Sequence, residues 1–302
     1  MKIHFIGIGE RILGDLAVTV CQQGHQVTGS DVSFSQLTLY SLESAELVPT
    51  QPGWFPQKIT KNLDKVIVGR QVHPDNPELH AAQRLGLPIL SYPQYIYDHA
   101  QDKQRIVITG GKDKTLICVL ILHVLTYCHK KFDYVVDSPN LEASVQLSNA
   151  PIMILEGDVD PSACTDTQPQ SLRYQHNIVL ISGIDDWKIS DTYPTLETYV
   201  EQMNRLANAS PKGGALIYCQ EDNLIHKIGS QARADVKAMP YNTHAHRYGH
   251  ERAYLITPQE EVPFQYADTV SMRAVAGARQ ILHTLAIPDQ RFYKALTTFF
   301  ID

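Results

Sequence analysis

Arg105-Ile-Val-Ile-Thr-Gly-Gly-Lys-Asp-Lys-Thr-Leu-Ile117 has the outline of a phosphate-binding loop. A β-branched run at 106–108 leads into two glycines, and Lys114-Thr115 then begins an apolar helical pattern. A strand that passes through a glycine turn into a helix places backbone N–H groups around the phosphates of a nucleotide. The stretch therefore predicts an α/β unit of the P-loop type.

One position of this loop departs from phosphate chemistry. Asp113 stands where a working loop has glycine before its lysine, and its carboxylate carries a negative charge. Backbone N–H groups crowd around phosphate oxygens where no side chain intrudes, and like charges repel. We therefore expect a nucleotide-binding scaffold whose catalytic function has lapsed, with a vestigial nucleotide site at Gly110, Gly111, Lys114 and Thr115.

Length and composition are typical of a globular protein with two domains. The 302 residues are 43% hydrophobic and 19% charged, which suits two packed cores. The formal net charge is −6 and there is no long basic run. This argues against nucleic-acid or acidic-membrane partners, since both require clustered Lys and Arg.

The cysteines and the beginning of the chain predict a soluble, cytoplasmic protein. The five cysteines are scattered and lack CxxC spacing, so we expect neither a disulfide framework nor a zinc site. Met1 runs directly into the first strand pattern, which leaves no room for a signal peptide. No apolar run approaches the length that crosses a bilayer.

Strand and helix patterns alternate along the chain and begin a nucleotide-type fold twice. The first series has strands at 2–8, 26–29, 65–69 and 88–90 and helices at 12–23 and 77–85. The second has strands at 106–108, 133–136, 151–155, 177–182 and 215–218 and helices at 195–208, 272–285 and 290–298. We expect a Rossmann-like domain with a parallel sheet at 1–100 and a P-loop-type α/β domain at 101–302.

The first strand also leads into a glycine loop, Phe5-Ile-Gly-Ile-Gly-Glu-Arg-Ile-Leu-Gly14, with Asp31 at the end of the next strand. Glycines in this context let a pyrophosphate approach backbone N–H groups. A dinucleotide fingerprint would have a third glycine where Ile12 stands, so NAD(P) is a poor match. Alternatively, Gly7 and Gly9 serve only a tight strand-to-helix turn.

Several motifs taken together resemble the Mur ligases, in particular the UDP-N-acetylmuramate:tripeptide ligases of murein recycling and the UDP-N-acetylmuramate:L-alanine ligases. These motifs are His4-Phe-Ile-Gly-Ile-Gly9, Val27-Thr-Gly-Ser-Asp31, Asp75-Asn-Pro-Glu-Leu79, Lys114-Thr115 and Glu156-Gly-Asp158. The resemblance implies an N-terminal domain for a UDP-muramyl substrate and a central ATPase domain. The family's C-terminal ligase domain has no counterpart in these 302 residues.

In the first domain the resemblance assigns residues to the UDP-sugar. It places the UDP diphosphate at Gly7, Ile8, Gly9 and Gly14 and the uridine at Asp31. Two neighbours depart from the small residues usual in the family, Glu10 and Arg11. A carboxylate beside a diphosphate is unfavourable unless the neighbouring guanidinium offsets it.

In the central domain the resemblance implies four departures from the active family. The loop that reads Gly-Thr/Ser-His-Gly-Lys-Thr-Thr in the family is altered, as noted above. Glu156 and Asp158 match the acidic magnesium motif, but Val159 replaces its last carboxylate and has no oxygen donor. In the segment 181–191, Trp187-Lys188 replaces the family's metal-binding Asp-His, and the adenine-binding patch has no recognisable equivalent in 268–274.

Other charged clusters have alternative interpretations. His244, His246 and His250 have a spacing that zinc ligands can show, yet a solvated loop is the simpler interpretation. Lys112 and Lys114 can equally form ion pairs with Asp113 and surrounding acids, in which case the charges of the loop are structural.

Three functions follow from these patterns. The first is a Mur-ligase-like protein of peptidoglycan metabolism that binds a UDP-muramyl compound, does not ligate, and acts by binding, with an active ligase as a possible protein partner. The second is an active ligase that uses ATP and Mg²⁺ with a divergent site. The third is an NAD(P)-binding oxidoreductase that uses the first glycine loop.

Overall fold

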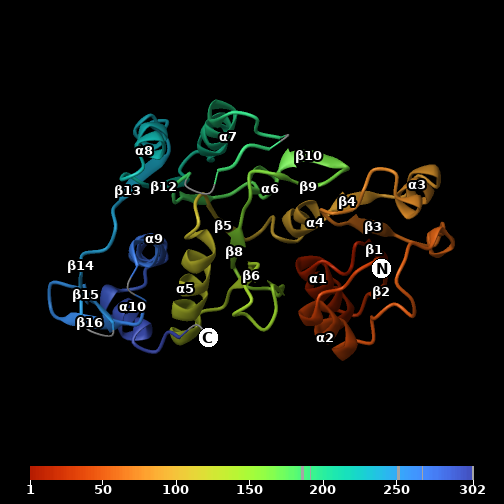
Figure 1. Ribbon diagram of the computed structural model, residues 1–302, viewed down its shortest axis with the longest axis horizontal. Coiled ribbons are helices and arrows are strands. Elements are labelled where there is room, and N and C mark those ends of the chain that lie inside the picture. Colours follow the sequence, from red (N-terminus) through yellow and green to blue (C-terminus); the bar gives the residue numbers. More distant parts are fainter. Residues whose placement is uncertain (185–186, 191, 250–251, 267, 301–302) are drawn as a thin grey trace.

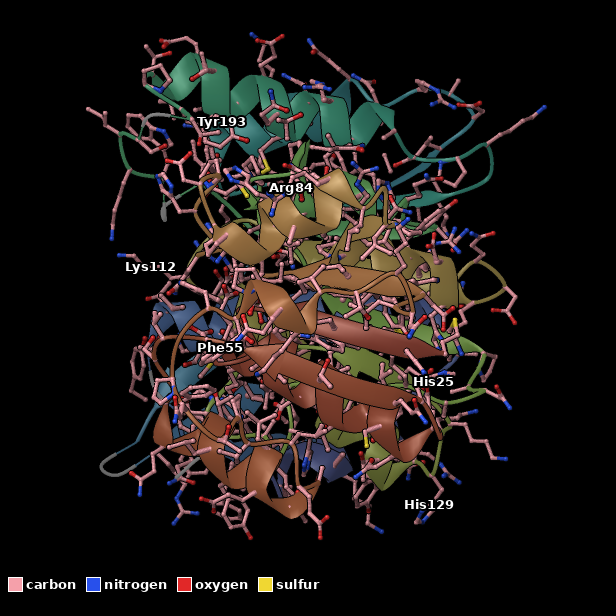
Figure 2. The ribbon with its side chains drawn as sticks, turned by 90° about the vertical axis from the view of Figure 1, so that its right-hand side faces the viewer. His25, Phe55, Arg84, Lys112, His129 and Tyr193 are labelled. Carbon is pink, nitrogen blue, oxygen red and sulfur yellow. The ribbon has the colours of Figure 1, made fainter. Side chains whose placement is uncertain are left out.

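A computed structural model describes residues 1–184, 187–190, 192–249, 252–266 and 268–300 (Figure 1). The chain forms two α/β units in sequence order, and the first lies on the right of the view. Figure 2 shows the first unit from its own side, with the second unit behind it. The α/β class predicted from the alternating patterns is confirmed.

The first unit contains a parallel sheet of four strands in the order β2-β1-β3-β4. The strands are β1 (Lys2–Ile6), β2 (Gln26–Ser30), β3 (Lys65–Val68) and β4 (Ile89–Ser91). The helices are α1 (Arg11–Gln22), α2 (Gln36–Ser44), α3 (Pro77–Arg84) and α4 (Tyr92–His99), with a short 3₁₀ turn η1 (Pro56–Lys58). Local signals set several helix starts: the Asn76 side chain accepts from two backbone N–H groups of α3, and proline follows at the first helical position.

The second unit contains a sheet of seven strands in the order β13-β12-β11-β5-β8-β6-β7. All neighbours are parallel except β7, which is antiparallel to β6. The strands are β5 (Gln104–Thr109), β6 (Asp133–Val135), β7 (Val145–Gln146), β8 (Ile152–Glu156), β11 (Ile178–Ile181), β12 (Ala215–Cys219) and β13 (Lys237–Tyr241). The helices are α5 (Lys114–Tyr127), α6 (Gln170–Arg173), α7 (Leu196–Asn208), α8 (Asn223–Ser230), α9 (Thr269–Thr284) and α10 (Asp289–Leu296).

Alternation along the buried strands separates two apolar cores. Ile106 and Ile108 of β5 join the core formed with α5, α9 and α10. Val107, between them, joins a second core that also contains residues of α7, α8 and helix α1 of the first unit. Because this second core continues from one unit into the other, the face of the large sheet that carries Val107 is also where the two units are joined.

Antiparallel elements add to the parallel plan, and the sequence patterns did not predict them. A hairpin is formed by β9 (Pro161–Ala163) and β10 (Asp166–Pro169), and a separate sheet by β14 (His246–Tyr248), β15 (Ala253–Ile256) and β16 (Glu261–Phe264). Helices α2, α6 and α8 were also not predicted. Among the described residues, no helix is both long and apolar enough to cross a membrane.

Contacts of α1 with the loops around β7 hold the first unit in place. The backbone N–H of Ser144 donates to the buried carboxylate of Asp15 at 2.6 Å. The Arg11 guanidinium donates to the Leu141 carbonyl at 2.7 Å. The N-terminal end of α1 therefore faces the carboxyl edge of the large sheet.

Candidate functional site

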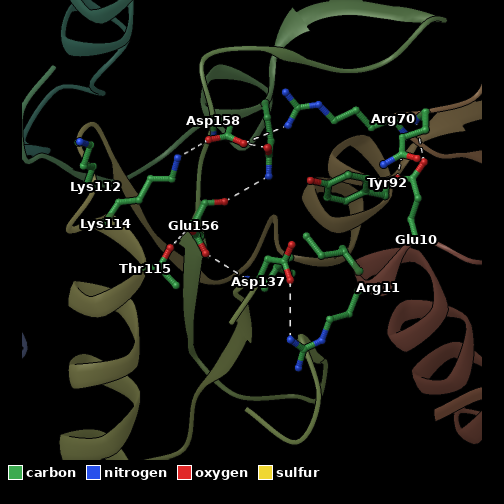
Figure 3. A pocket seen from close by; sticks show the side chains of 15 residues that line it. Glu10, Arg11, Arg70, Tyr92, Lys112, Lys114, Thr115, Asp137, Glu156 and Asp158 are labelled. Carbon is green, nitrogen blue, oxygen red and sulfur yellow. Dashed lines mark hydrogen bonds and ion pairs between the residues drawn. The ribbon is translucent and has the colours of Figure 1, made fainter. Parts of the chain in front are cut away.

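A cavity of about 750 Å³ lies at the junction of the two units (Figure 3). Most of its walls come from the last residues of strands β6 and β8 and from segments that follow strands β1, β3, β4, β5, β6 and β8, so it lies at the carboxyl ends of both sheets. Open α/β sheets bind ligands at this edge. The first unit contributes Glu10, Arg11, Ile12, Arg70, Gln71 and Tyr92, and the second Gly111, Lys112, Lys114, Thr115, Val135, Asp137, Glu156, Asp158 and Gln170.

The predicted nucleotide residues lie at this cavity or next to it. Gly111, Lys114 and Thr115 line it, and Gly110 lines a smaller cavity of about 210 Å³ that shares Lys114 and Asp158 with it. Gly110 has a φ of +116°, and a Cβ there would lie 2.8 Å from the Gly183 carbonyl oxygen. The Gly111 N–H donates to the Ser182 hydroxyl at 3.0 Å. These two glycines therefore have structural roles whether or not a phosphate binds.

Lys114 lies in a chain of ion pairs that crosses the junction. Its Nζ is 2.6 Å from Asp158 Oδ1, and Arg70 Nη1 is 3.1 Å from the other oxygen, Oδ2. Arg70 Nη2 also contacts Asp160 Oδ2 at 3.2 Å. Although burial acts to raise it, the two cations hold the pKa of Asp158 below its usual value. The sequence allowed ion pairs between Lys114 and surrounding acids, and the pair with Asp158 is one of them.

Thr115 and Glu156 form a second contact in the cavity. The Thr115 hydroxyl donates to Glu156 Oε1 at 2.6 Å, and the backbone N–H of Asp137 donates to Oε2 at 3.0 Å. Burial raises the pKa of Glu156 to about 7, and the Thr115 hydroxyl and the Lys114 ammonium oppose this shift. Glu156 is therefore partly protonated at neutral pH.

Replacing Glu156 by glutamine should flatten the pH dependence of stability. A raised carboxyl pKa means that the folded protein binds the proton more tightly, so the contribution of Glu156 to wild-type stability is complete below about pH 4.5 and is lost as the pH rises through about 7. Because the carboxylate lies at the wall of an open cavity and is partly solvated, we expect a loss of only about 1–2 kcal/mol. Urea unfolding at pH 5 and pH 8 measures it. The exposed Glu201→Gln should retain the wild-type slope, and an unchanged slope in Glu156→Gln would contradict the prediction.

Asp113 corrects an expectation from the sequence. Its side chain is fully buried and pairs with Arg273 of α9, with 2.7 Å between Nε and Oδ2. Burial, followed by the charge of Asp113, raises the pKa of Tyr241 well above its usual value. The carboxylate thus lies in the core behind the loop and is offset by a cation, so the expected repulsion of phosphate by Asp113 is wrong. Arg273 lies in the segment 268–274, which the resemblance places where the Mur ligases have their adenine-binding patch.

The backbone N–H groups of the first glycine loop donate hydrogen bonds within the first unit. Those of Gly7 and Ile8 donate to the Ser30 carbonyl, and that of Gly9 donates to Asp31 Oδ2 at 2.9 Å. Asp31 also accepts from the next two backbone N–H groups and is 7% exposed. The five residues predicted for the UDP-sugar are buried and do not line the cavity, so their assignment stays a prediction. The N-terminal residues of α1, Arg11 and Ile12, line it instead.

Glu10 and Arg11, the two departures from the family in the first loop, contact different partners. Glu10 accepts from the backbone N–H groups of Arg70 and Gln71, at 3.0 and 2.7 Å, and burial raises its pKa. Arg11 contacts the Leu141 carbonyl and lies 3.9 Å from Asp137. Glu10 therefore supports the loop that presents Arg70 to the cavity.

The remaining predicted clusters are only partly described. Trp187 and Lys188 line the smaller cavity together with Lys114, while residues 185, 186 and 191 lie outside the described residues. His244 contacts the Tyr293 hydroxyl at 2.7 Å, and His250 is not described. Within the described part of the chain, no group of three or more His, Cys, Asp or Glu side chains is placed to hold a metal ion.

Several residues of the cavity were not singled out from the sequence, among them Arg70, Tyr92, Asp137 and Gln170. Arg70 and Asp137 follow predicted parallel strands within two residues of the strand ends. Position after such a strand is itself a signal for a ligand site. Tyr92 begins α4, and Gln170 begins α6, which was not predicted.

Comparisons with known proteins agree with the fold. A family model described as Mur ligase family, catalytic domain, matches residues 2–104. The UDP-N-acetylmuramate–L-alanyl-γ-D-glutamyl-meso-2,6-diaminoheptandioate ligase of Escherichia coli is 26% identical over 227 residues, 74% of this chain and 49% of that protein. The chain spans about half the length of this and other curated relatives that it matches.

Solved structures of two ligases are similar over nearly the whole chain. A UDP-N-acetylmuramate:L-alanyl-γ-D-glutamyl-meso-diaminopimelate ligase from Neisseria meningitides has a TM-score of 0.84 at 16% identity and covers 100% of this chain and 98% of its own. The UDP-N-acetylmuramate–alanine ligase of Thermotoga maritima has a TM-score of 0.78 at 18% identity and covers 99% and 68%. At these identities the likeness concerns the fold.

Proposed function

This chain belongs to the Mur ligase family, and from that premise we propose that it binds a UDP-muramyl-type nucleotide at the junction cavity and does not catalyse ligation. The curated relatives of this chain are named as ligases of UDP-N-acetylmuramate. The N-terminal end of α1 lines the cavity and favours a diphosphate. Its first-turn N–H groups have no side-chain cap, and Arg11 adds a positive charge. The protein would then act by binding, and an active ligase is its candidate partner.

One observation carries the inactive half of the proposal. Lys114, the lysine that a phosphate loop offers to its nucleotide, has its ammonium 2.6 Å from Asp158. Ligation through an acyl phosphate requires ATP, a magnesium ion that bridges its phosphates, and cations that stabilise the transferred group. A lysine neutralised by a neighbouring carboxylate attracts a triphosphate less strongly.

The donors around the cavity also fit a magnesium ion poorly. Both Asp158 oxygens contact cations, and both Glu156 oxygens accept hydrogen bonds from Thr115 and from the backbone of Asp137. Magnesium requires near-octahedral oxygen ligands, for which these oxygens would first have to leave their partners. We therefore assign no reaction step to a metal ion in this chain.

Calorimetric titration of the purified chain tests the proposal. We expect UDP-N-acetylmuramate to bind with measurable heat, ATP with Mg²⁺ to give none, and no ADP to form when tripeptide is added. The E. coli tripeptide ligase, assayed in parallel, is the positive control. Absence of UDP-N-acetylmuramate binding would overturn the binding half, and ADP formation that depends on the muramyl substrate would overturn the inactive half.

The second candidate is an active ATP-dependent ligase. It is favoured by the contact of Thr115 with Glu156, which brings a hydroxyl and a carboxylate of the kinds that hold magnesium in phosphate loops within 2.6 Å of each other. The same ADP measurement decides between the two. An NAD(P) oxidoreductase is disfavoured because the Asp31 carboxylate, which would accept a ribose hydroxyl, already accepts three backbone N–H groups.

A further inference from the structure

Asp158 lies between two cations that come from different units of the fold (Figure 3). Its Oδ1 faces the Lys114 ammonium of α5, and its Oδ2 faces the Arg70 guanidinium from the loop after β3. The separations are 2.6 and 3.1 Å. An anion whose oxygens each contact a different cation is also the arrangement in which Lys and Arg hold a phosphate group.

Both cations are anchored by backbone that does not involve Asp158. Lys114 is the first residue of α5, where the helix N-terminus also favours an anion. The backbone N–H groups of Arg70 and Gln71 donate to the carboxylate of Glu10. The two positive charges should therefore stay beside the cavity when the carboxylate between them is removed.

The three side chains are open to the cavity. Arg70 is 45% exposed, Asp158 33% and Lys114 18%, and all three line the cavity wall. A ligand can therefore reach the cations without unfolding of the surrounding structure. A carboxylate held in this way is exchangeable, because partly exposed ion pairs contribute little net free energy.

We propose that Lys114 and Arg70 form an anion subsite divided between the two units, and that Asp158 occupies it as an internal anion that a phosphate group of the ligand must displace. The inference rests on the proposed function, because it takes the junction cavity as the nucleotide site. It adds Arg70 as the first unit's contribution to phosphate binding. It also gives Asp158 a role opposite to that of a magnesium ligand, because its charge competes with the ligand.

Magnesium-free titrations test this inference, with ATP and UDP as separate probes in the presence of EDTA. Asp158→Asn keeps the shape of the side chain and removes its charge, so binding of one or both probes should tighten about tenfold or more relative to the wild type, since removal of one adjacent charge is worth at least a pKa unit. ATP alone would place its phosphates in the subsite, and UDP alone would place the diphosphate of the UDP-sugar there. The matched control is Asp235→Asn, which removes an exposed carboxylate paired with Arg233 and should leave both affinities unchanged.

A second variant separates the subsite from a general change in charge. Adding Arg70→Met to Asp158→Asn should abolish the gain, because one of the two cations is then missing. The inference is overturned if the wild type and Asp158→Asn bind each probe equally, or if neither protein binds either probe detectably. A gain in affinity that persists without Arg70 also overturns it. Thermal melting of each variant confirms that it is folded. These ratios between variants are independent of whether the wild type binds UDP-N-acetylmuramate or forms ADP, so failure of the proposed function is recognised separately.

Discussion

Replacing Arg273 by methionine should lower the free energy of unfolding by about 3–5 kcal/mol, because it leaves the buried carboxylate of Asp113 without its counter-charge. The Asp113 side chain is fully buried and that of Arg273 is 17% exposed, so water cannot take the place of the guanidinium. The loss should be visible as an earlier midpoint in urea unfolding followed by circular dichroism. Methionine retains most of the aliphatic length of arginine, which limits the contribution of lost packing.

A control on the same helix and a double variant make this prediction specific. Arg279 of α9 pairs with Asp289 at a site where both side chains are about two-fifths exposed. Arg279→Met should therefore cost about 0–1 kcal/mol. The double variant Asp113→Asn with Arg273→Met should recover most of the loss, since no charge is then buried alone. Equal losses for Arg273→Met and Arg279→Met would show that Asp113 is solvated in a way that its burial does not indicate.

The two parallel sheets could be predicted because their signals are local. Each glycine loop follows a strand pattern and precedes an apolar helical pattern, and the observed elements β1, α1, β5 and α5 begin within two residues of the predicted positions. Strand and helix periodicities are set by neighbouring residues, so one sequence is sufficient. The sheet formed by β14, β15 and β16 was not predicted, because its strands carry no run of β-branched residues and β16 contains a proline, which argues against a strand.

The electrostatics of the site could not be predicted, because they depend on partners far apart in the sequence. Asp113 and Arg273 are 160 residues apart, and Arg70 and Asp158 are 88 apart. Residue type gives the sign of a charge but not the direction of the side chain. The sequence assigned Lys114 and Thr115 to a nucleotide site and Glu156 and Asp158 to a magnesium motif, and all four line one cavity. It placed the charge of Asp113, however, on the wrong side of the loop.

The sequence also leaves open whether the glycines of the first loop serve close packing or the approach of a diphosphate, and Gly9→Ala tests this question. A Cβ at Gly9 would lie 1.9 Å from the Ser33 carbonyl oxygen and 2.8 Å from Asp31 Oδ2, so the backbone after β2 must move. We expect a loss of about 3 kcal/mol in the free energy of unfolding, at the upper end of overpacking effects, because the clash is with backbone rather than with a flexible side chain. Urea unfolding of the variant without ligand measures it.

Gly24→Ala separates crowding from backbone strain. Gly24 has a φ of +87°, and a Cβ there would meet nothing within 4 Å. Its substitution should cost about 1 kcal/mol, from the left-handed conformation alone. If Gly9→Ala costs no more than this and instead weakens binding of UDP-N-acetylmuramate, Gly9 serves the approach of a diphosphate. If it costs about 3 kcal/mol without ligand, close packing of the loop against Asp31 and Ser33 is sufficient to require glycine there.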